Sequence, residues 1–348
     1  MRKYFWMACL ALALPAYAAE IQFNFAKYAE GTTPTNFTPV LVGHGQPGAW
    51  KIMMEKIPSA FTPFAGQAPA VNRSPVLAQT SQDMTDEHFP LFIFNGETFR
   101  NFKLTTRFKI LSGIAEQMAG VVFRYQNASN YYVVRASALG KNVRFYKVVN
   151  GIRSDPIGPK VDVPADVWHT LAVQCDGNQI SFWFDDKLVM PPLGDNSFSQ
   201  GRLGFCTKSD AVACFTDAKV NYTPIISAAQ ALVNRTLERQ TRLLGLRIYT
   251  LTTNETTRVI ASKEASEIGM AGAEAELKAI EDGAVLFGRE KDSVLVTMPL
   301  QDRNGDPIAA VRVEMKSFPG ETETTAVTRA RQIVKEMQQQ VLSKQDLF

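Results

Sequence analysis

Apolar and polar residues alternate through three neighbouring stretches near the middle of the chain. The stretches are Ala119–Asn127, Tyr131–Ser137 and Val143–Val149, and the turn pair Asn150-Gly151 follows the third. A period of two is typical of β-strands, whose successive side chains point to opposite faces of a sheet. The pattern therefore predicts three adjacent strands in one sheet with two unlike faces.

The alternation also assigns side chains to faces. In the second stretch it places Val134 and Ala136 on one face, and Tyr131, Val133 and Arg135 on the other. The first face has the character of a core, whereas the second mixes apolar, aromatic and charged groups.

Each predicted strand also carries a basic residue: Arg124, then Arg135, then Arg144 or Lys147 depending on register. Such a row can lie along the outer face, where the side-chain stems cover apolar surface. It can equally line a binding groove. The sequence leaves both alternatives open, and the functional interpretation depends on which of them holds.

Further alternating stretches and strong hairpin turns, such as Asp176-Gly177, occur on both sides of this region. About ten short strands without a clear helix predict an all-β antiparallel jelly-roll sandwich over residues 20–223. The other main stretches are His88–Phe94, Phe102–Ile110, Trp168–Cys175, Gln179–Asp186, Gly201–Thr207 and Val212–Tyr222.

The pattern changes at Thr223-Pro224, after which apolar residues recur at helical spacing. The remaining residues 224–348 are predicted to form a smaller α+β domain whose apolar helix faces pack on its sheet. The expected helices are Ile225–Leu246, Gly272–Gly283 and residues 324–343, and the clearest expected strands are Ser293–Leu300 and Asp306–Met315.

Residues 1–19 have the features of a secretory signal peptide: Arg2 and Lys3, then an apolar run, then Ala16-Tyr17-Ala18 as a cleavage site. The apolar run is too short to span a bilayer, and no other segment is longer. We expect a mature protein without an integral membrane segment, located in the periplasm or secreted.

Charge excludes one class of partner. Without Arg2 and Lys3 the 37 basic residues fall to 35, against 34 acidic residues, so the mature chain is almost neutral. A protein that binds nucleic acid by neutralising phosphates needs a clear basic excess. No nucleic-acid partner is therefore expected.

Three cysteines remain after the signal peptide: Cys175, Cys206 and Cys214. In an oxidising compartment an odd number leaves at least one free thiol. A symmetric hairpin would bring Cys206 and Cys214 opposite each other, so a disulfide between them is one hypothesis. The alternative is three small buried side chains within strands.

The first domain resembles the concanavalin-like jelly rolls, a group that includes laminin-G domains, lectins and glucanases. Two stretches carry the resemblance, WHTLAVQCDGNQISFWFDDKLV and GRLGFCTKSDAVACFTDAKV. With NYYVVRASALGKNVRFYKV, they are more narrowly similar to the exported 3-keto-disaccharide hydrolase family. That narrower resemblance implies a hydrolase or lyase acting on 3-keto-glycosides.

The second domain resembles extracellular sensors of the Cache type, which have a PAS-like fold. The stretch VLVTMPLQDRNGDPIAAVRVEM is similar to their P-L-x-D hairpin. The resemblance implies a small-molecule pocket between the sheet and the IGMAGAEAE loop, which Arg247 and Tyr249 could face. A homodimer through this domain is a further hypothesis.

Catalytic signals are weak. The chain lacks the E-x-D-x-x-E strand that retaining glucanases use for paired carboxylates. His44 in a glycine-rich loop and Asp86 in an acidic segment are the candidate catalytic residues. The histidines have no metal-ligand spacing, so no metal site is predicted. Related jelly rolls hold calcium, which makes calcium the one cofactor that the resemblance allows, with Asp185, Asp186 and Asp217 as candidates by position.

Sugar sites combine aromatic platforms with a few polar side chains that orient hydroxyl groups. The residues predicted to bind such a ligand are Arg124, Asn130, Tyr131, Arg135 and Lys147. The first hypothesis is thus an exported protein that binds a carbohydrate-like ligand, with a second domain that senses a small molecule or contacts a partner. The alternatives are a glycoside-cleaving hydrolase of the 3-keto-disaccharide type and a non-catalytic structural protein.

Overall fold

The computed structural model describes residues 19–58 and 71–348. The predicted signal peptide lies, apart from Ala19, outside the described residues. The chain divides into two compact units, of which the first ends at Ile225 and the second runs over Ile226–Phe348. Within the part of the chain that the structure describes, no helix is both long and apolar enough to cross a membrane.

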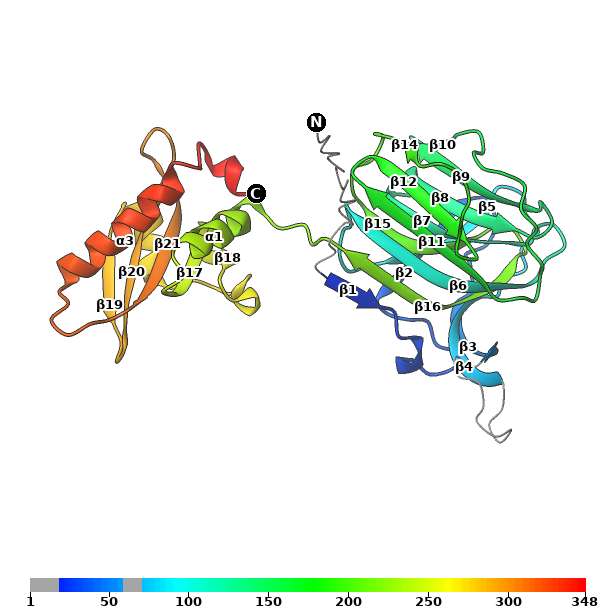
Figure 1. Ribbon diagram of the computed structural model, residues 1–348, viewed down its shortest axis with the longest axis horizontal. Coiled ribbons are helices and arrows are strands. Elements are labelled where there is room, and N and C mark those ends of the chain that lie inside the picture. The colour runs from blue at the N-terminus through cyan, green and yellow to red at the C-terminus, as the bar shows by residue number, and fades with distance from the viewer. Residues whose placement is uncertain (1–18, 59–70) are drawn as a thin grey trace, which may run out of the picture. The chain divides into compact units, whose positions relative to one another are not determined.

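The first unit consists of two antiparallel sheets that face each other (Figure 1). One sheet has the order β13-β12-β11-β6-β16-β4-β3, with β1 paired to β16 and β14 paired to β12. Its strands are β1 (Ala19–Gln22), β3 (Trp50–Pro58), β4 (Val71–Gln79), β6 (Phe102–Ser112), β11 (His169–Asp176), β12 (Gln179–Phe184), β13 (Lys187–Leu188), β14 (Leu193–Gly194) and β16 (Val212–Tyr222).

The second sheet has the order β10-β9-β8-β7-β15-β5-β2. Its strands are β2 (Phe37–Gly43), β5 (His88–Phe94), β7 (Met118–Asn127), β8 (Asn130–Ser137), β9 (Asn142–Val149), β10 (Ile152–Arg153) and β15 (Arg202–Thr207). A short 3₁₀ helix, Phe25–Lys27, lies between β1 and β2.

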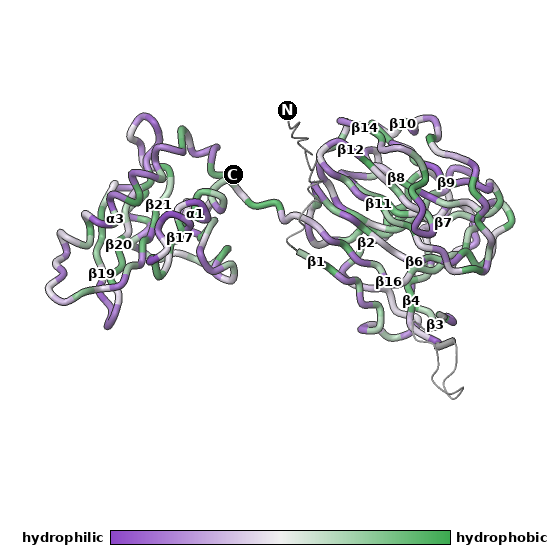
Figure 2. The backbone as a smooth tube through the Cα atoms, viewed as in Figure 1, coloured by the Kyte–Doolittle hydropathy of each residue, from purple (hydrophilic) through white to green (hydrophobic). Residues whose placement is uncertain are grey.

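The core of the sandwich is an aromatic layer between the two sheets. Phe92 and Phe205 enter it from the seven-stranded sheet, and Phe108 and Phe215 enter it from the nine-stranded sheet. All four side chains are at most 1% exposed. Hydrophobic and hydrophilic segments are mixed along the strands (Figure 2), and smaller apolar clusters lie outside this core. The predicted antiparallel sandwich is confirmed.

The three stretches with the clearest alternation form β7, β8 and β9, which are neighbours in the sheet. In β8 the predicted faces are confirmed, because Val134 and Ala136 belong to the core between the sheets. Tyr131 and Val133 belong to a separate cluster on the outer face of the seven-stranded sheet. That outer face carries the candidate functional site described below.

Arg124 departs from the pattern. Its neighbours Phe123 and Val122 face the core and the outer cluster respectively, so strict alternation would point Arg124 outward. The register of β7 against β8 shifts after Phe123, and Arg124 has a φ of 48°. This β-bulge interrupts the alternation and buries the arginine completely.

The predicted disulfide is wrong, because all three cysteines of the described chain are free and buried. Cys206 lies on β15 and packs on the outer face of the seven-stranded sheet. Cys214 lies on β16 and packs on the outer face of the nine-stranded sheet. The two side chains therefore point away from each other on opposite sides of the sandwich, since β15 and β16 belong to different sheets rather than to one hairpin.

We expect reduction to leave the stability of the protein unchanged. Burial raises the pKa of Cys214 and of Cys175 to about 12 and also raises the pKa of Cys206, so the reactive thiolate is scarce at neutral pH. Dithiothreitol should not shift the melting temperature. A thiol reagent should modify Cys175, Cys206 and Cys214 only after the protein is unfolded. A lower melting temperature in dithiothreitol would contradict this expectation.

The second unit is a five-stranded antiparallel sheet of order β18-β17-β21-β20-β19 with helices packed on it. Its strands are β17 (Leu243–Leu251), β18 (Thr257–Ser262), β19 (Leu286–Arg289), β20 (Ser293–Gln301) and β21 (Pro307–Lys316). Its helices are α1 (Ala228–Arg239), α2 (Glu274–Glu281) and α3 (Glu323–Gln338), with 3₁₀ turns at Ala265–Glu267 and Lys344–Leu347.

Helices α1 and α3 share one core with the sheet, and α2 packs in a separate cluster with Tyr249 and Ala310. The expected apolar stripe of α3 is buried, as Ala330 and Met337 show. The helix expected over Ile225–Leu246 is shorter than predicted, because it ends at Arg239 and β17 begins at Leu243. The Cache or PAS-like nature of this unit stays a prediction.

Candidate functional site

A cavity of about 530 Å³ lies on the outer face of the seven-stranded sheet. Its lining comes from β2, β5, β7, β8, β9, β10 and β15 and from the loops that flank them. The volume falls within the range of about 300–1,000 Å³ that small-molecule sites occupy. The cavity thus uses the face that the strand alternation leaves free of the sandwich core.

The floor of the cavity is apolar and consists of side chains that stand on neighbouring strands. Tyr131 from β8 is 4% exposed, and burial raises the pKa of its hydroxyl. The floor residues are Leu91, Met118, Tyr131, Val133, Val148 and Cys206. Such a floor excludes water, which strengthens the electrostatic interactions of polar groups at its edge.

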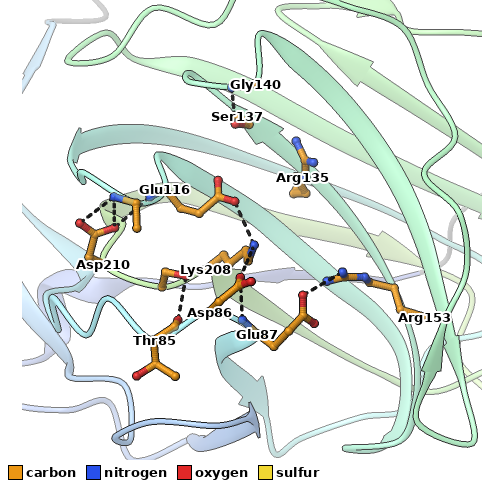
Figure 3. A network of polar contacts seen from close by, with 12 residues as sticks. Thr85, Asp86, Glu87, Glu116, Arg135, Ser137, Gly140, Arg153, Lys208 and Asp210 are labelled. Atoms are coloured by element: carbon orange, nitrogen blue, oxygen red, sulfur yellow. Dashed lines mark hydrogen bonds and ion pairs between the residues drawn. The ribbon is translucent and has the colours of Figure 1, made fainter.

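Charged side chains surround this floor in two ion-paired groups. Arg153 and Glu87 form one group, with 3.0 Å between Nη2 and Oε1. Lys208 forms the other and bridges two carboxylates, Glu116 at 3.0 Å and Asp86 at 3.1 Å. Figure 3 shows both groups beside the strand that carries Arg135.

Hydrogen bonds keep Lys208 charged. Burial by itself lowers the pKa of this amine, but its bonds to Glu116 and Asp86 outweigh that effect and raise the pKa above its ordinary value. The side chain of Lys208 is 18% exposed. It is therefore a fixed cation at the edge of the cavity.

Asp210 fixes the loop that carries Glu116. Its carboxylate accepts hydrogen bonds from the backbone N–H groups of Ile114, Ala115 and Glu116, at 2.5–3.0 Å (Figure 3). Burial would raise the pKa of Asp210, but these three donors lower it below its ordinary value of 3.8. Asp210 is thus a buried anion that positions one wall of the cavity.

Arg135 and Tyr146 form a third polar element of the lining. The Arg135 guanidinium donates to the Tyr146 hydroxyl at 2.7 Å and to the side-chain carbonyl of Asn142. Its carbon lies 5.3 Å from the centre of the Tyr146 ring. The Arg153 guanidinium lies 5.7 Å from the same ring centre. Tyr146 therefore supplies an aromatic surface next to two cations.

The structure brings together Tyr131 and Arg135 of the predicted binding residues, since both line the cavity. Arg124 does not line this cavity, and its role as a binding residue stays a prediction. Its guanidinium donates to the backbone carbonyls of Phe198 at 2.7 Å, Arg100 at 3.3 Å and Gly177. Arg124 holds three loops together at the end of the sandwich, because the bulge turns it away from the outer face.

Asn130 and Lys147 also lie outside the cavity lining. The Asn130 side chain accepts from the backbone N–H of Asn150 and so fixes the turn between β9 and β10. Lys147 pairs with Asp195 at 2.6 Å. Lys147 is opposite Tyr132 in the β8–β9 pair, and Tyr132 faces the core. Lys147 therefore starts from the core side of the sheet, which explains why it does not line a cavity on the outer face.

Of the two candidate catalytic residues, His44 lines the cavity and Asp86 does not. The His44 backbone N–H donates to the Glu87 carbonyl at 3.0 Å. Gly43 makes this approach possible: its φ is 86°, and a Cβ atom there would lie 1.7 Å from the Glu87 carbonyl oxygen. Asp86 is 82% exposed and reaches the site through Lys208.

Four charged residues of the site escaped the sequence analysis: Glu87, Glu116, Arg153 and Lys208. Three of them lie in turns, just before β5, just before β7 and just after β15, and Arg153 ends the two-residue strand β10. Strand periodicity does not assign such positions to a face. The signal that these four residues share is a charged side chain at a strand end or within two positions of one.

Within residues 19–58 and 71–348, no group of three or more His, Cys, Asp or Glu side chains is placed to hold a metal ion. Asp185 instead contacts His169, with 2.8 Å between Oδ2 and Nδ1. Asp217 pairs with Arg107 at 3.3 Å. The calcium hypothesis stays a prediction.

In the second unit, Arg247 is bound by Glu267 through two hydrogen bonds of 2.6 and 2.7 Å. Tyr249 is buried in the cluster under α2. Arg312, opposite Arg247 on β21, pairs with the fully buried Glu276. The charges on this face of the sheet are thus balanced by one another.

The first unit is, by fold and site, a β-sandwich domain with a partly apolar, charge-lined cavity on the outer face of one sheet. Residues 80–213 match the model of the 3-keto-alpha-glucoside-1,2-lyase-like domain family. The match covers less than half of the chain and includes every charged residue of the cavity lining except His44. The first unit therefore contains a domain similar to the 3-keto-disaccharide hydrolases, as the sequence motifs indicated.

Two solved structures are also similar to the chain. The carbohydrate-binding module CBM66 from Bacillus subtilis is 20% identical, with 49% of this chain and 94% of that chain covered and a TM-score of 0.37. A Bacillus subtilis protein of unknown function with a galectin-like fold is 13% identical, with 50% and 89% covered and a TM-score of 0.33. None of the curated proteins matches the chain.

Proposed function

We propose that the first unit binds a carbohydrate-like ligand in the cavity on its seven-stranded sheet, in the periplasm or outside the cell. One observation carries the proposal: a single cavity combines the aromatic side chains Phe89, Tyr131 and Tyr146 with charged hydrogen-bonding groups at its edge. Sugars require this pairing, because their C–H faces stack on rings and their hydroxyl groups need oriented polar partners. The match to a family that acts on 3-keto-glucosides supports the same ligand class.

The second unit, on this proposal, is a Cache or PAS-like module that binds a small molecule or a partner protein. Its five-stranded antiparallel sheet with helices packed on it supports this assignment. A homodimer formed through this unit remains a prediction that light scattering of the full chain would test.

We expect at least one sugar to raise the melting temperature of the mature protein, and Tyr146→Ala to weaken its binding about tenfold or more. The reason is that Tyr146 supplies both an aromatic surface and the hydroxyl that holds Arg135. A thermal-shift panel of neutral, acidic and 3-keto sugars on the full mature chain makes the measurement. If no sugar raises the melting temperature, the binding proposal fails and a structural role takes its place.

A second candidate function is cleavage of 3-keto-glycosides. It is favoured by the family match and by two carboxylates, Glu87 and Glu116, that line one cavity with His44. A carbonyl at C3 acidifies the C2–H bond. A base could take that proton while the C1–O bond breaks and an acid protonates the departing oxygen, which leaves a C1–C2 double bond.

The same panel separates the two functions when the sugars are recovered and analysed. A binding protein returns a 3-keto-glycoside unchanged, whereas an enzyme releases the alcohol that was attached at C1. For an enzyme, alanine in place of His44, or glutamine in place of Glu116, should abolish turnover and preserve binding. If turnover persists in both variants, neither residue is catalytic.

A further inference from the structure

Three cationic side chains line the cavity: Arg135, Arg153 and Lys208. Two of them are paired with carboxylates and one is not. Arg153 is paired with Glu87 at 3.0 Å. Lys208 is paired with Glu116 and Asp86. Among the described residues, Arg135 has no acidic partner within ion-pair distance, and in Figure 3 it stands apart from both groups.

Both hydrogen-bond partners of Arg135 are neutral. Its two terminal nitrogens donate to the Asn142 carbonyl oxygen and the Tyr146 hydroxyl. A guanidinium has five N–H donors in a fixed plane, so three remain after these two bonds. The two partners therefore orient the group without neutralising it.

The surroundings of Arg135 increase the unbalanced charge. Arg144 lies directly opposite it in the β8–β9 pair, which puts both side chains on the same face of the sheet. Arg144 donates to the backbone carbonyl of Gly158, which is also neutral. The apolar floor next to Arg135, formed by Val133 and Cys206, keeps the local dielectric constant low.

We infer that the ligand carries an anionic group, and that a carboxylate of an acidic sugar binds to Arg135. This inference rests on the proposed function and names its ligand class: uronic acids and their glycosides. The planar guanidinium matches the two oxygens of a carboxylate. The sugar ring would lie on Tyr146, which stands beside Arg135 on the same face and is only partly buried.

Isothermal titration calorimetry of the full mature chain tests the carboxylate preference with two sets of matched sugars. The first set compares methyl glucoside with methyl glucuronide and methyl glucoside 6-sulfate. The second compares galactobiose with digalacturonate. We expect the carboxylated member of a pair to bind at least about tenfold more tightly, because a hydrogen bond to a charged group contributes that much. Arg135→Gln should abolish the preference. Arg202→Gln is the matched control, since Arg202 is exposed on β15 of the same sheet and does not line the cavity.

The outcomes are distinct. Equal affinity for the members of a pair would overturn the inference and leave the binding proposal intact, and tighter binding of the sulfate would overturn the assignment to a carboxylate. If neither member of any pair binds, both fail. A preference that persists in Arg135→Gln would exclude Arg135 as its origin. Should Arg135→Gln not fold, Tyr146→Phe removes the hydroxyl that orients the guanidinium and should reduce the preference severalfold.

Discussion

Arg124→Ala is expected to destabilise the first unit by about 3 kcal/mol. The side chain is fully buried and donates to the carbonyls of Phe198, Arg100 and Gly177. Each buried acceptor left without a partner costs about 1–3 kcal/mol, and relief of the buried charge offsets part of the sum. The three loops that meet at Arg124 should separate in the variant.

Urea unfolding followed by tryptophan fluorescence measures this effect in the full chain. The tryptophans of the described residues, Trp50, Trp168 and Trp183, all lie in the first unit, so the signal reports that unit alone. Arg124→Lys should recover part of the stability, because one amine replaces one of the three bonds. Arg202→Ala on the exposed face should change stability by less than about 0.5 kcal/mol. If Arg124→Ala changes the free energy of unfolding as little as Arg202→Ala does, Arg124 does not hold the three loops together.

Asp210→Ala is expected to cost about 2–4 kcal/mol and also to weaken ligand binding. The carboxylate accepts hydrogen bonds from three backbone N–H groups, and bonds to a charged group contribute about 1.5–3 kcal/mol each. Water offsets part of this sum in the variant, because Ile114 and Ala115 are exposed. Without it the loop that carries Glu116 loses its anchor, and the ion pair of Glu116 with Lys208 at the cavity edge becomes looser. Titration calorimetry and urea unfolding of the same sample give both quantities.

The stability that Asp210 provides should depend on pH in a defined direction. The pKa of Asp210 in the folded protein is below its ordinary value of 3.8. Its contribution is therefore fully present above about pH 4 and is lost as the pH falls through the folded pKa. Asp210→Asn should lose less stability than the wild-type protein between pH 5 and pH 2. If the free energy of unfolding changes with pH in the same way for both proteins, this role of Asp210 is contradicted.

The cavity is built from two kinds of structure, strands and loops. The floor of the cavity is a property of strand faces, whereas its charged edge is assembled by loops that Asp210, Lys208 and Arg153 hold in place. Both proposed functions use the same apolar floor. They differ in the role of the charged side chains at the edge of the cavity. For binding, Arg135 orients a ligand. For cleavage, Glu87 or Glu116 would also have to exchange a proton with it.

The sandwich and the two faces of β8 could be predicted from the local sequence pattern alone. Alternation in a strand is a local property, because successive side chains point to opposite sides whatever the neighbouring strand is. Tyr131 and Arg135 could therefore be placed on the outer face in advance. The same alternation within β9 puts Lys147 on the face of Val143 and Phe145, which belong to the core, whereas the sequence analysis left Arg144 and Lys147 open as alternatives.

The position of Arg124, the state of the cysteines and the composition of the cavity depend on strand order and tertiary packing. Arg124 turns inward because β7 carries a bulge, and a bulge depends on how two strands fit each other. Cys206 and Cys214 are close in the chain but belong to different sheets, so strand order keeps them apart. Glu87 and Lys208 meet at one cavity across 121 residues of chain, because β5 and β15 are neighbours in the sheet. Local periodicity contains no information about such distant pairings, and the functional site consists of them.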